Sequence, residues 1–148
     1  MKFVGFDREE DAIRWVKRTI GIQAPTGFCR ALSCVDDAGE FVFVVVLSNF
    51  GGANVDLHTA AVPGARWATP RAFLAIFNAT FDYTFNTLGA KRVTGLVRAD
   101  NAAARQFDEH IGFELEGRMR QAFPDGTDCL IYGFLKSDYE KHPLRRSK

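Results

Sequence analysis

The chain has 148 residues, of which 47% are hydrophobic and 25% are charged, so it is long enough to bury one substantial core. Its net charge of +1 excludes a general electrostatic attraction to nucleic acid or to a membrane surface, and its longest apolar run, 41–47, is too short to span a bilayer. Three cysteines without zinc-like spacing, together with the lack of a charged-then-apolar leader, favour reduced thiols in a cytoplasmic protein.

The first half of the chain is predicted to form a short edge strand, a helix and a three-strand meander. Ile13, Val16 and Ile20 recur at helical spacing behind an Asp–Glu capping box, which predicts an amphipathic helix. The run 41–47 has no polar face, which is typical of a central strand covered on both sides. The expected strands cover 2–6, 28–35, 40–50 and 54–62.

The second half is predicted to alternate helices with strands. Thr69 and Pro70 provide an N-cap and a first helical residue, and phenylalanines at helical spacing follow them. The expected elements are helices from 70 to 88 and from 101 to 111, and strands over 92–97, 113–120 and 129–135. This order contains one strand–helix–strand crossover, which should be right-handed and parallel. It predicts an α/β (α+β) fold with a mixed, mostly antiparallel sheet of six to seven strands and helices on both faces.

A single domain is expected over 1–140, followed by a basic tail from Lys141 to Lys148. We interpret the tail as a solvated, partly disordered end, and expect no nucleic-acid or membrane partner. The alternative is a nucleic-acid-binding tail, which predicts steeply salt-dependent association. The histidines at 58, 110 and 142 are too scattered to suggest a metal site. Known nucleophile-elbow, phosphate-loop and zinc-protease motifs are absent from the sequence.

The segment 101–117 carries the most specific pattern in the chain. An asparagine opens an alanine-rich helix, Gly112 closes it, and a phenylalanine starts the next strand. The full pattern, N-x-x-A-x7-G-F-x-x-E-G, resembles the second half of the acetyl-CoA-binding core of GNAT-fold N-acetyltransferases. The predicted order of elements also resembles that fold along nearly the whole chain. The resemblance implies acetyl-CoA as cosubstrate, with Asn101 and Ala104 beside it, and direct transfer of the acetyl group to a primary amine.

In that family, the turn before the Phe-rich helix holds the pyrophosphate of acetyl-CoA, because a helix N-terminus offers free N–H groups and a positive dipole end. The family's usual loop is Q/R-x-x-G-x-G/A. The segment 64–71 departs from it, since both interior glycines are missing and Pro70 removes an N–H donor. The candidate cofactor-binding residues in this turn are Arg66, Trp67, Ala68, Thr69 and Arg71. The two arginines can offset the missing donors with charge-assisted hydrogen bonds. The alternative is a surface loop that only caps a structural helix.

The reaction needs a polarised carbonyl, a base for the amine and an acid for the departing thiolate. The resemblance places a carbonyl-polarising N–H near Ala60 to Val62, where Ala61 and Val62 are the candidate cofactor-binding residues. The family's acid, a tyrosine seven residues after the helix-opening asparagine, is replaced here by Asp108, a poor proton donor at neutral pH unless its pKa is strongly shifted.

Three other side chains are the candidate catalytic groups. His58 and Asp56, on the polar face of a strand that should end at the cofactor, are candidate bases, and Tyr132 is a candidate acid. The alternatives are a hydrogen-bonded histidine–aspartate pair under a helix and a tyrosine packed in its strand.

The C-terminal part, with 113–120, Asp128 and 132–135, also resembles the branch of ribosomal-protein N-terminal acetyltransferases. We therefore expect an N-acetyltransferase acting on a protein N-terminus or on a small amine. The alternative is a catalytically inactive GNAT-fold module with a binding or structural role, which the missing glycines and the missing tyrosine favour. Open strand edges make a homodimer reasonable.

Overall fold

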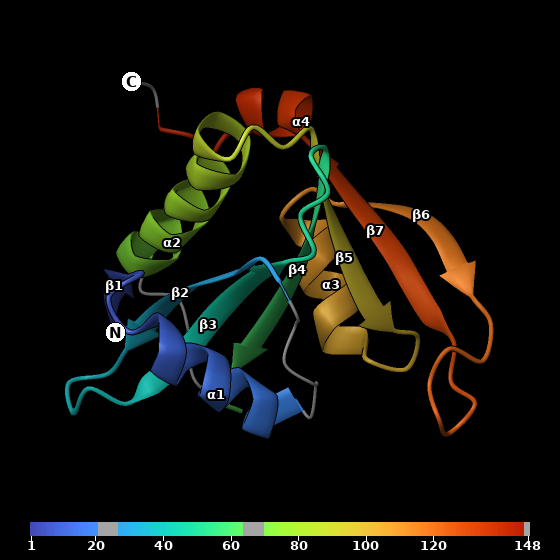
Figure 1. Ribbon diagram of the computed structural model, residues 1–148, viewed down its shortest axis with the longest axis horizontal. Coiled ribbons are helices and arrows are strands. Elements are labelled where there is room, and N and C mark those ends of the chain that lie inside the picture. The colour runs from blue at the N-terminus through green and yellow to red at the C-terminus, as the bar shows by residue number, and fades with distance from the viewer. Residues whose placement is uncertain (21–26, 64–69, 147–148) are drawn as a thin grey trace.

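The computed structural model describes residues 1–20, 27–63 and 70–146, which fold around one mixed sheet (Figure 1). Within these ranges the strands are β1 (Lys2–Gly5), β2 (Cys29–Val35), β3 (Phe41–Ser48), β4 (Asn54–Ala61), β5 (Arg92–Arg98), β6 (Glu114–Met119) and β7 (Cys129–Leu135). The α-helices are α1 (Glu9–Ile20), α2 (Pro70–Asp82), α3 (Ala102–His110) and α4 (Lys136–Glu140). The strand order is β1-β2-β3-β4-β5-β7-β6, and among these described strands only β4 and β5 pair in parallel. The predicted fold class is therefore confirmed.

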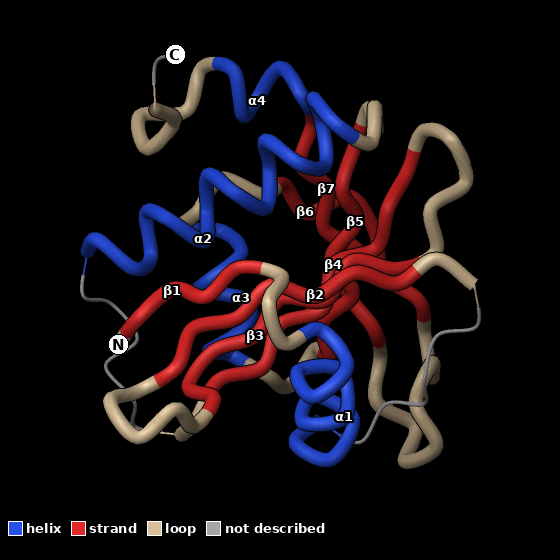
Figure 2. Tube along the Cα trace, turned by 60° about the vertical axis from the view of Figure 1, so that its left-hand side comes forward, coloured by secondary structure: helices blue, strands red, loops and turns tan. Residues whose placement is uncertain are grey.

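Strand β3 shows why helices cover both faces of the sheet. Phe43, Val45 and Leu47 belong to the larger core under α2, whereas Val44 and Val46 belong to a smaller core under α1. Alternate side chains of a strand point to opposite faces, so a strand without polar residues must be covered twice. Figure 2 shows the result, with α1 on one side of the sheet and α2 on the other. Helix α3 lies on the α2 side, because its Ala104 and Phe107 pack against the larger core.

The Phe-rich face of α2 packs against the sheet through edge-to-face and tilted aromatic contacts. Phe81 lies 4.9 Å from Phe77 and 4.7 Å from Phe134 of β7, measured between ring centroids. The helix continues as a single π-helical turn over Tyr83–Thr87, where the N–H of Leu88 donates to the Tyr83 carbonyl at 2.7 Å. The predicted helix therefore holds to residue 88, with a widened last turn. No helix in the described ranges is long and apolar enough to cross a membrane.

The C-terminal segment contradicts the prediction of a solvated tail from residue 141. The chain forms α4 directly after β7, which the sequence did not predict, and then packs on α2 as far as residue 146. The buried amide of Asn78 holds this segment, because it donates to the Leu144 carbonyl at 2.9 Å and accepts from the Arg146 N–H at 2.9 Å. The hydroxyl of Tyr139 donates to the same amide oxygen at 3.2 Å. Residues 141–146 are thus part of the fold.

The parallel pairing of β4 and β5 ends halfway along both strands. Their register runs from Asn54 opposite Arg92 to Leu57 opposite Gly95, although β4 continues to residue 61 and β5 to residue 98. Figure 1 shows the arrowheads of β4 and β5 diverging at these carboxyl ends. Open sheets with parallel strands commonly bind ligands where neighbouring strands part in this way. The separation of β4 from β5, called the splay below, positions the candidate site.

Candidate functional site

A pocket of about 400 Å³ lies in the splay, and the alternation of strand side chains divides its lining into two halves. The half on the α3 side of the sheet, called the α3 half, includes Thr59, Gly95, Val97, Asn101, Ala104 and Asp108. The half on the opposite side, called the α1 half, includes His58, Leu96, Arg98, Met119, Phe123 and Cys129. The pocket therefore offers two chemically different walls, one on each side of the sheet.

The first turn of α3 forms part of the α3 half. The side chain of Asn101 accepts a hydrogen bond from the backbone N–H of Ala104 at 3.1 Å, so the predicted N-cap is present. Both residues line the pocket. The small side chain of Ala104 leaves room along the helix, and the structure brings together these two residues that the sequence pattern had linked.

Asp108 is the most unusual group in the pocket. It is 6% exposed, and no residue in the described ranges donates a hydrogen bond to its carboxylate. Burial, with a smaller contribution from the neighbouring charge of Glu109, raises its pKa to about 7. Gly95 of β5 makes this position possible, because a Cβ there would lie 3.1 Å from Oδ2 of Asp108. The objection that an aspartate is a poor proton donor at neutral pH therefore does not hold here.

His58 lies in the α1 half, and Asp56 lies outside the pocket. Burial lowers the pKa of His58, and the nearby carboxylate of Asp56 opposes the shift. Asp56 sits where β4 is still paired with β5, and its two oxygens accept amide hydrogen bonds from Asn49 at 3.0 Å and Asn54 at 3.1 Å. The structure thus brings only the histidine of this predicted pair to the pocket, as a neutral imidazole at pH 7.

Tyr132 is not brought to the pocket. Its side chain is fully buried in β7, and its hydroxyl donates to Oε1 of Glu109 at 2.8 Å. A phenol committed to a carboxylate in the core has no path to a ligand in the splay. The geometry therefore favours the alternative that this tyrosine packs in its strand.

The two candidate cofactor-binding residues at the end of β4, Ala61 and Val62, differ in their backbone bonding. The N–H of Val62 donates to the carbonyl of Val42 at 3.0 Å, so it points toward β3 and is already used. Because N–H groups along a strand alternate in direction, those of Thr59 and Ala61 point toward the side that β5 has left. Of the predicted pair, only Ala61 offers a donor to the splay, and Thr59 adds a second donor that the sequence did not suggest.

Most of the predicted phosphate-binding turn, with Arg66, Trp67, Ala68 and Thr69, lies outside the described residues. Arg71 is described and is exposed in the first turn of α2. The described residues contain no group of three histidine, cysteine or acidic side chains placed to hold a metal ion.

The connection between β6 and β7 forms the outer wall of the α1 half. Arg98 at the end of β5 makes ion pairs with Asp100 at 3.1 Å and with Asp125 of this connection at 2.5 Å. Its guanidinium also lies over the ring of Phe123, 4.7 Å from the centroid. These contacts hold the connection against β5. Neither Arg98 nor Phe123 is among the residues predicted from the sequence, because only the folded hairpin brings Phe123 to the splay.

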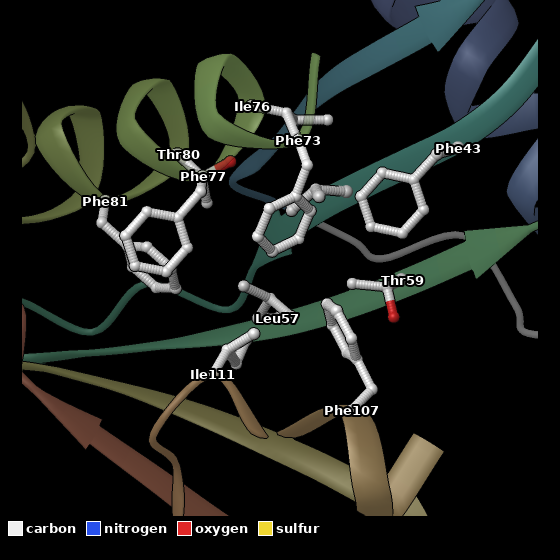
Figure 3. Close-up of a pocket in the computed structure, with 11 residues that line it drawn as sticks. Phe43, Leu57, Thr59, Phe73, Ile76, Phe77, Thr80, Phe81, Phe107 and Ile111 are labelled. Carbon is white, nitrogen blue, oxygen red and sulfur yellow. The ribbon is translucent and has the colours of Figure 1, made fainter. Parts of the chain in front are cut away.

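A second, smaller cavity of about 30 Å³ lies deeper, between α2, α3 and the sheet. Figure 3 shows the rings of Phe43, Phe73 and Phe107 converging on it from β3, α2 and α3. Apart from two threonines its lining is apolar, so we interpret it as a dry gap in the core and not as a site for a polar ligand. The splay pocket is therefore the better candidate for chemistry.

No protein-family model matches the chain, and no curated protein matches it in sequence. Solved structures do match, among them a chimera of the Vibrio cholerae spermidine N-acetyltransferase SpeG with hSSAT, at 15% identity and a TM-score of 0.69 over 95% of this chain and 100% of that one. The Vibrio cholerae spermidine N-acetyltransferase in complex with CoA and spermine matches at 17% identity and a TM-score of 0.68, over 95% and 98% of the two chains. A dodecameric structure of that enzyme matches at 16% identity and a TM-score of 0.67, over 95% of both chains. The chain therefore has the GNAT fold of these acetyltransferases.

Proposed function

We propose that this protein is an N-acetyltransferase that moves an acetyl group from acetyl-CoA to a primary amine. The observation that carries the proposal is the splay pocket, which has a neutral histidine in one half and, in the other, a buried carboxyl group to which no described residue donates a hydrogen bond. The GNAT fold, which a solved acetyltransferase with bound CoA and spermine shares, supports it.

We assign the α3 half to acetyl-CoA, which supplies an activated acyl thioester when bound. Gly95 has no side chain and Ala104 has only a methyl group, so this wall leaves room for a ligand to lie against it. Arg71 lies in the first turn of α2, which is on the same side of the sheet, and Arg66 precedes that helix in sequence, so both charges suit the pyrophosphate. The N–H groups of Thr59 and Ala61 in β4 are directed at the splay, where they would polarise the thioester carbonyl.

The two titratable groups in the pocket suit the two proton transfers. His58 in the α1 half accepts the proton of the incoming ammonium, which frees the nitrogen lone pair to attack the carbonyl carbon. A C–N bond forms, the C–S bond breaks, and the electron pair leaves with sulfur. The new amide nitrogen then loses its second proton to solvent, which leaves a neutral amide. Asp108 in the α3 half then donates its proton to that sulfur. Each group is buried enough to hold the required neutral state near pH 7.

The identity of the acceptor and the oligomeric state belong to the proposal. A protein N-terminus and a small amine both fit a primary-amine acceptor, and the likeness to ribosomal-protein N-terminal acetyltransferases stays a hypothesis that no solved structure named above supports. The Vibrio cholerae enzyme forms a dodecamer, which makes oligomerisation of this chain worth testing by light scattering. A cytoplasmic location stays a prediction from the cysteines.

Calorimetric titration with acetyl-CoA, followed by thiol release with an amine panel, tests the proposal. We expect binding that weakens on Arg66→Ala, and thiol release that requires both amine and His58. Lack of binding at millimolar acetyl-CoA would refute the enzyme and favour an inactive module. Binding without thiol release for any primary amine would point to the same alternative.

A further inference from the structure

We propose that the α1 half of the splay pocket binds a small primary amine with a single positive charge and an apolar body. This inference rests on the proposed acetyl transfer and names the class of its acceptor. It differs from the polyamine seen with the structurally similar Vibrio cholerae enzyme.

The first support is the apolar surface that the α1 half leaves open. Leu96 of β5 is 38% exposed and Met119 of β6 is 39% exposed, and both line the pocket. The ring of Phe123 stands beside them on the β6–β7 connection, and the buried thiol of Cys129 backs the wall. Large apolar side chains exposed together in a concave site mark the place where an apolar ligand group is buried.

The second support is the absence of acidic side chains from the described lining of this half. Its charged residue is Arg98, whose guanidinium already holds Asp100 and Asp125. The segments 21–26 and 64–69 contain no aspartate or glutamate in the sequence, so neither can supply one. A polyamine carries several ammonium groups, and burying each of them without a carboxylate is costly.

The third support concerns a peptide acceptor. A peptide presents an amide N–H and a carbonyl at every residue, and these groups need partners when they are buried. Leu96, Met119 and Phe123 offer none from their side chains. The position of His58 in the same half suits one ammonium group at the inner end of an otherwise apolar molecule.

The test compares 2-phenylethylamine, spermidine and the tripeptide Ser-Gly-Gly as acceptors at saturating acetyl-CoA. We expect kcat/KM for 2-phenylethylamine to exceed the other two by at least about tenfold. Met119→Glu places a carboxylate in the apolar wall and should lower the ratio of 2-phenylethylamine to spermidine by at least about tenfold. The matched control is Leu115→Glu, at a 54% exposed leucine of the same strand outside the pocket, which should leave the ratio unchanged.

Direct binding of 2-phenylethylamine, measured by saturation-transfer NMR with and without acetyl-CoA, separates this inference from the proposed function. Binding that Met119→Glu weakens and Leu115→Glu does not supports the apolar acceptor site even if acetyl transfer fails. A preference for spermidine or the tripeptide would overturn the inference and leave the acetyltransferase standing. Equal effects of the two glutamate variants, or no binding of 2-phenylethylamine, would also overturn it.

Discussion

Replacing Asp108 with asparagine should make the protein more stable and less active at the same time. The variant removes a buried charge and keeps nearly the same shape. The pKa of Asp108 is raised from 3.8 to about 7, so the folded state holds this proton more tightly than the unfolded chain does. Its contribution to stability is therefore complete below pH 3.8 and is lost as pH rises toward 7. The difference corresponds to a penalty of roughly 4 kcal/mol at pH 8 and less than about 1 kcal/mol at pH 4.

We therefore expect Asp108→Asn to raise the free energy of unfolding by about 2–4 kcal/mol at pH 8 and by less than about 1 kcal/mol at pH 4. An amide cannot donate a proton to a thiolate, so kcat should fall by about 10²–10³-fold. The affinity for acetyl-CoA should change only a few fold, because the amide fills the same volume beside Gly95.

Urea unfolding followed by tryptophan fluorescence at the two pH values measures the first effect. Thiol release and calorimetry measure the others. The control is Asp37→Asn, at an exposed carboxylate in the turn between β2 and β3, which should alter neither stability nor kcat appreciably. A variant whose gain in stability is the same at pH 4 and pH 8 would refute the burial argument, and an unchanged kcat would refute the proton-donor role.

Three further changes probe other parts of the site and fold. His58→Gln should lower kcat by about 10²-fold and remove the rising limb of the pH–rate profile. In the wild type the midpoint of this limb lies below pH 6.5, because burial lowers the pKa of the imidazole. A rising limb that remains in the variant would contradict the role of His58 as the base. Gly95→Ala should lower kcat/KM for acetyl-CoA by at least about tenfold and cost about 1–3 kcal/mol of stability, because the new methyl group lies 3.1 Å from Oδ2 of Asp108. Full activity in steady-state assays would show that Asp108 can move aside without harming the site. Asn78→Ala should lower the free energy of unfolding, measured in urea, by about 2–4 kcal/mol, because Leu144 and Arg146 lose their hydrogen bonds to the amide. Unaltered stability would mean that this amide does not hold the C-terminal segment.

The fold could be predicted where a pattern has one physical solution. An all-apolar run such as 41–47 has to be covered on both faces, which fixes β3 as a central strand with helices on either side. The crossover after β4 follows from a long helix between two strands, since such a connection makes its strands parallel. Asn101 is predictable as a cap because its amide replaces a missing helical hydrogen bond locally, without any help from the rest of the fold.

The site could be predicted only in part, because pKa values and long-range contacts depend on the folded surroundings. Asp108 looks like an ordinary helical aspartate in sequence, and only its burial against Gly95 makes it a proton donor near neutrality. Tyr132 looked like a candidate acid because no spacing tells which face of β7 meets the pocket. The basic residues after 140 looked solvated because the amide that binds them lies more than 60 residues earlier, at Asn78.

Burial acts in opposite directions on the two titratable groups of the splay pocket. It lowers the pKa of His58 and raises that of Asp108, because in both cases it disfavours the charged form. In water the carboxylic acid, with a pKa of 3.8, loses its proton well before the imidazole, with a pKa of 6.5, loses its own, so a proton shared between them would sit on the base. Here the neutral forms are stabilised together, one on each side of the sheet. A neutral base and a protonated acid are what an amine losing a proton and a thiolate gaining one require, and divergent environments of this kind commonly mark acid–base assignments in enzymes. The parting of β4 from β5 is what lets both groups reach one pocket while the sheet keeps them on separate walls.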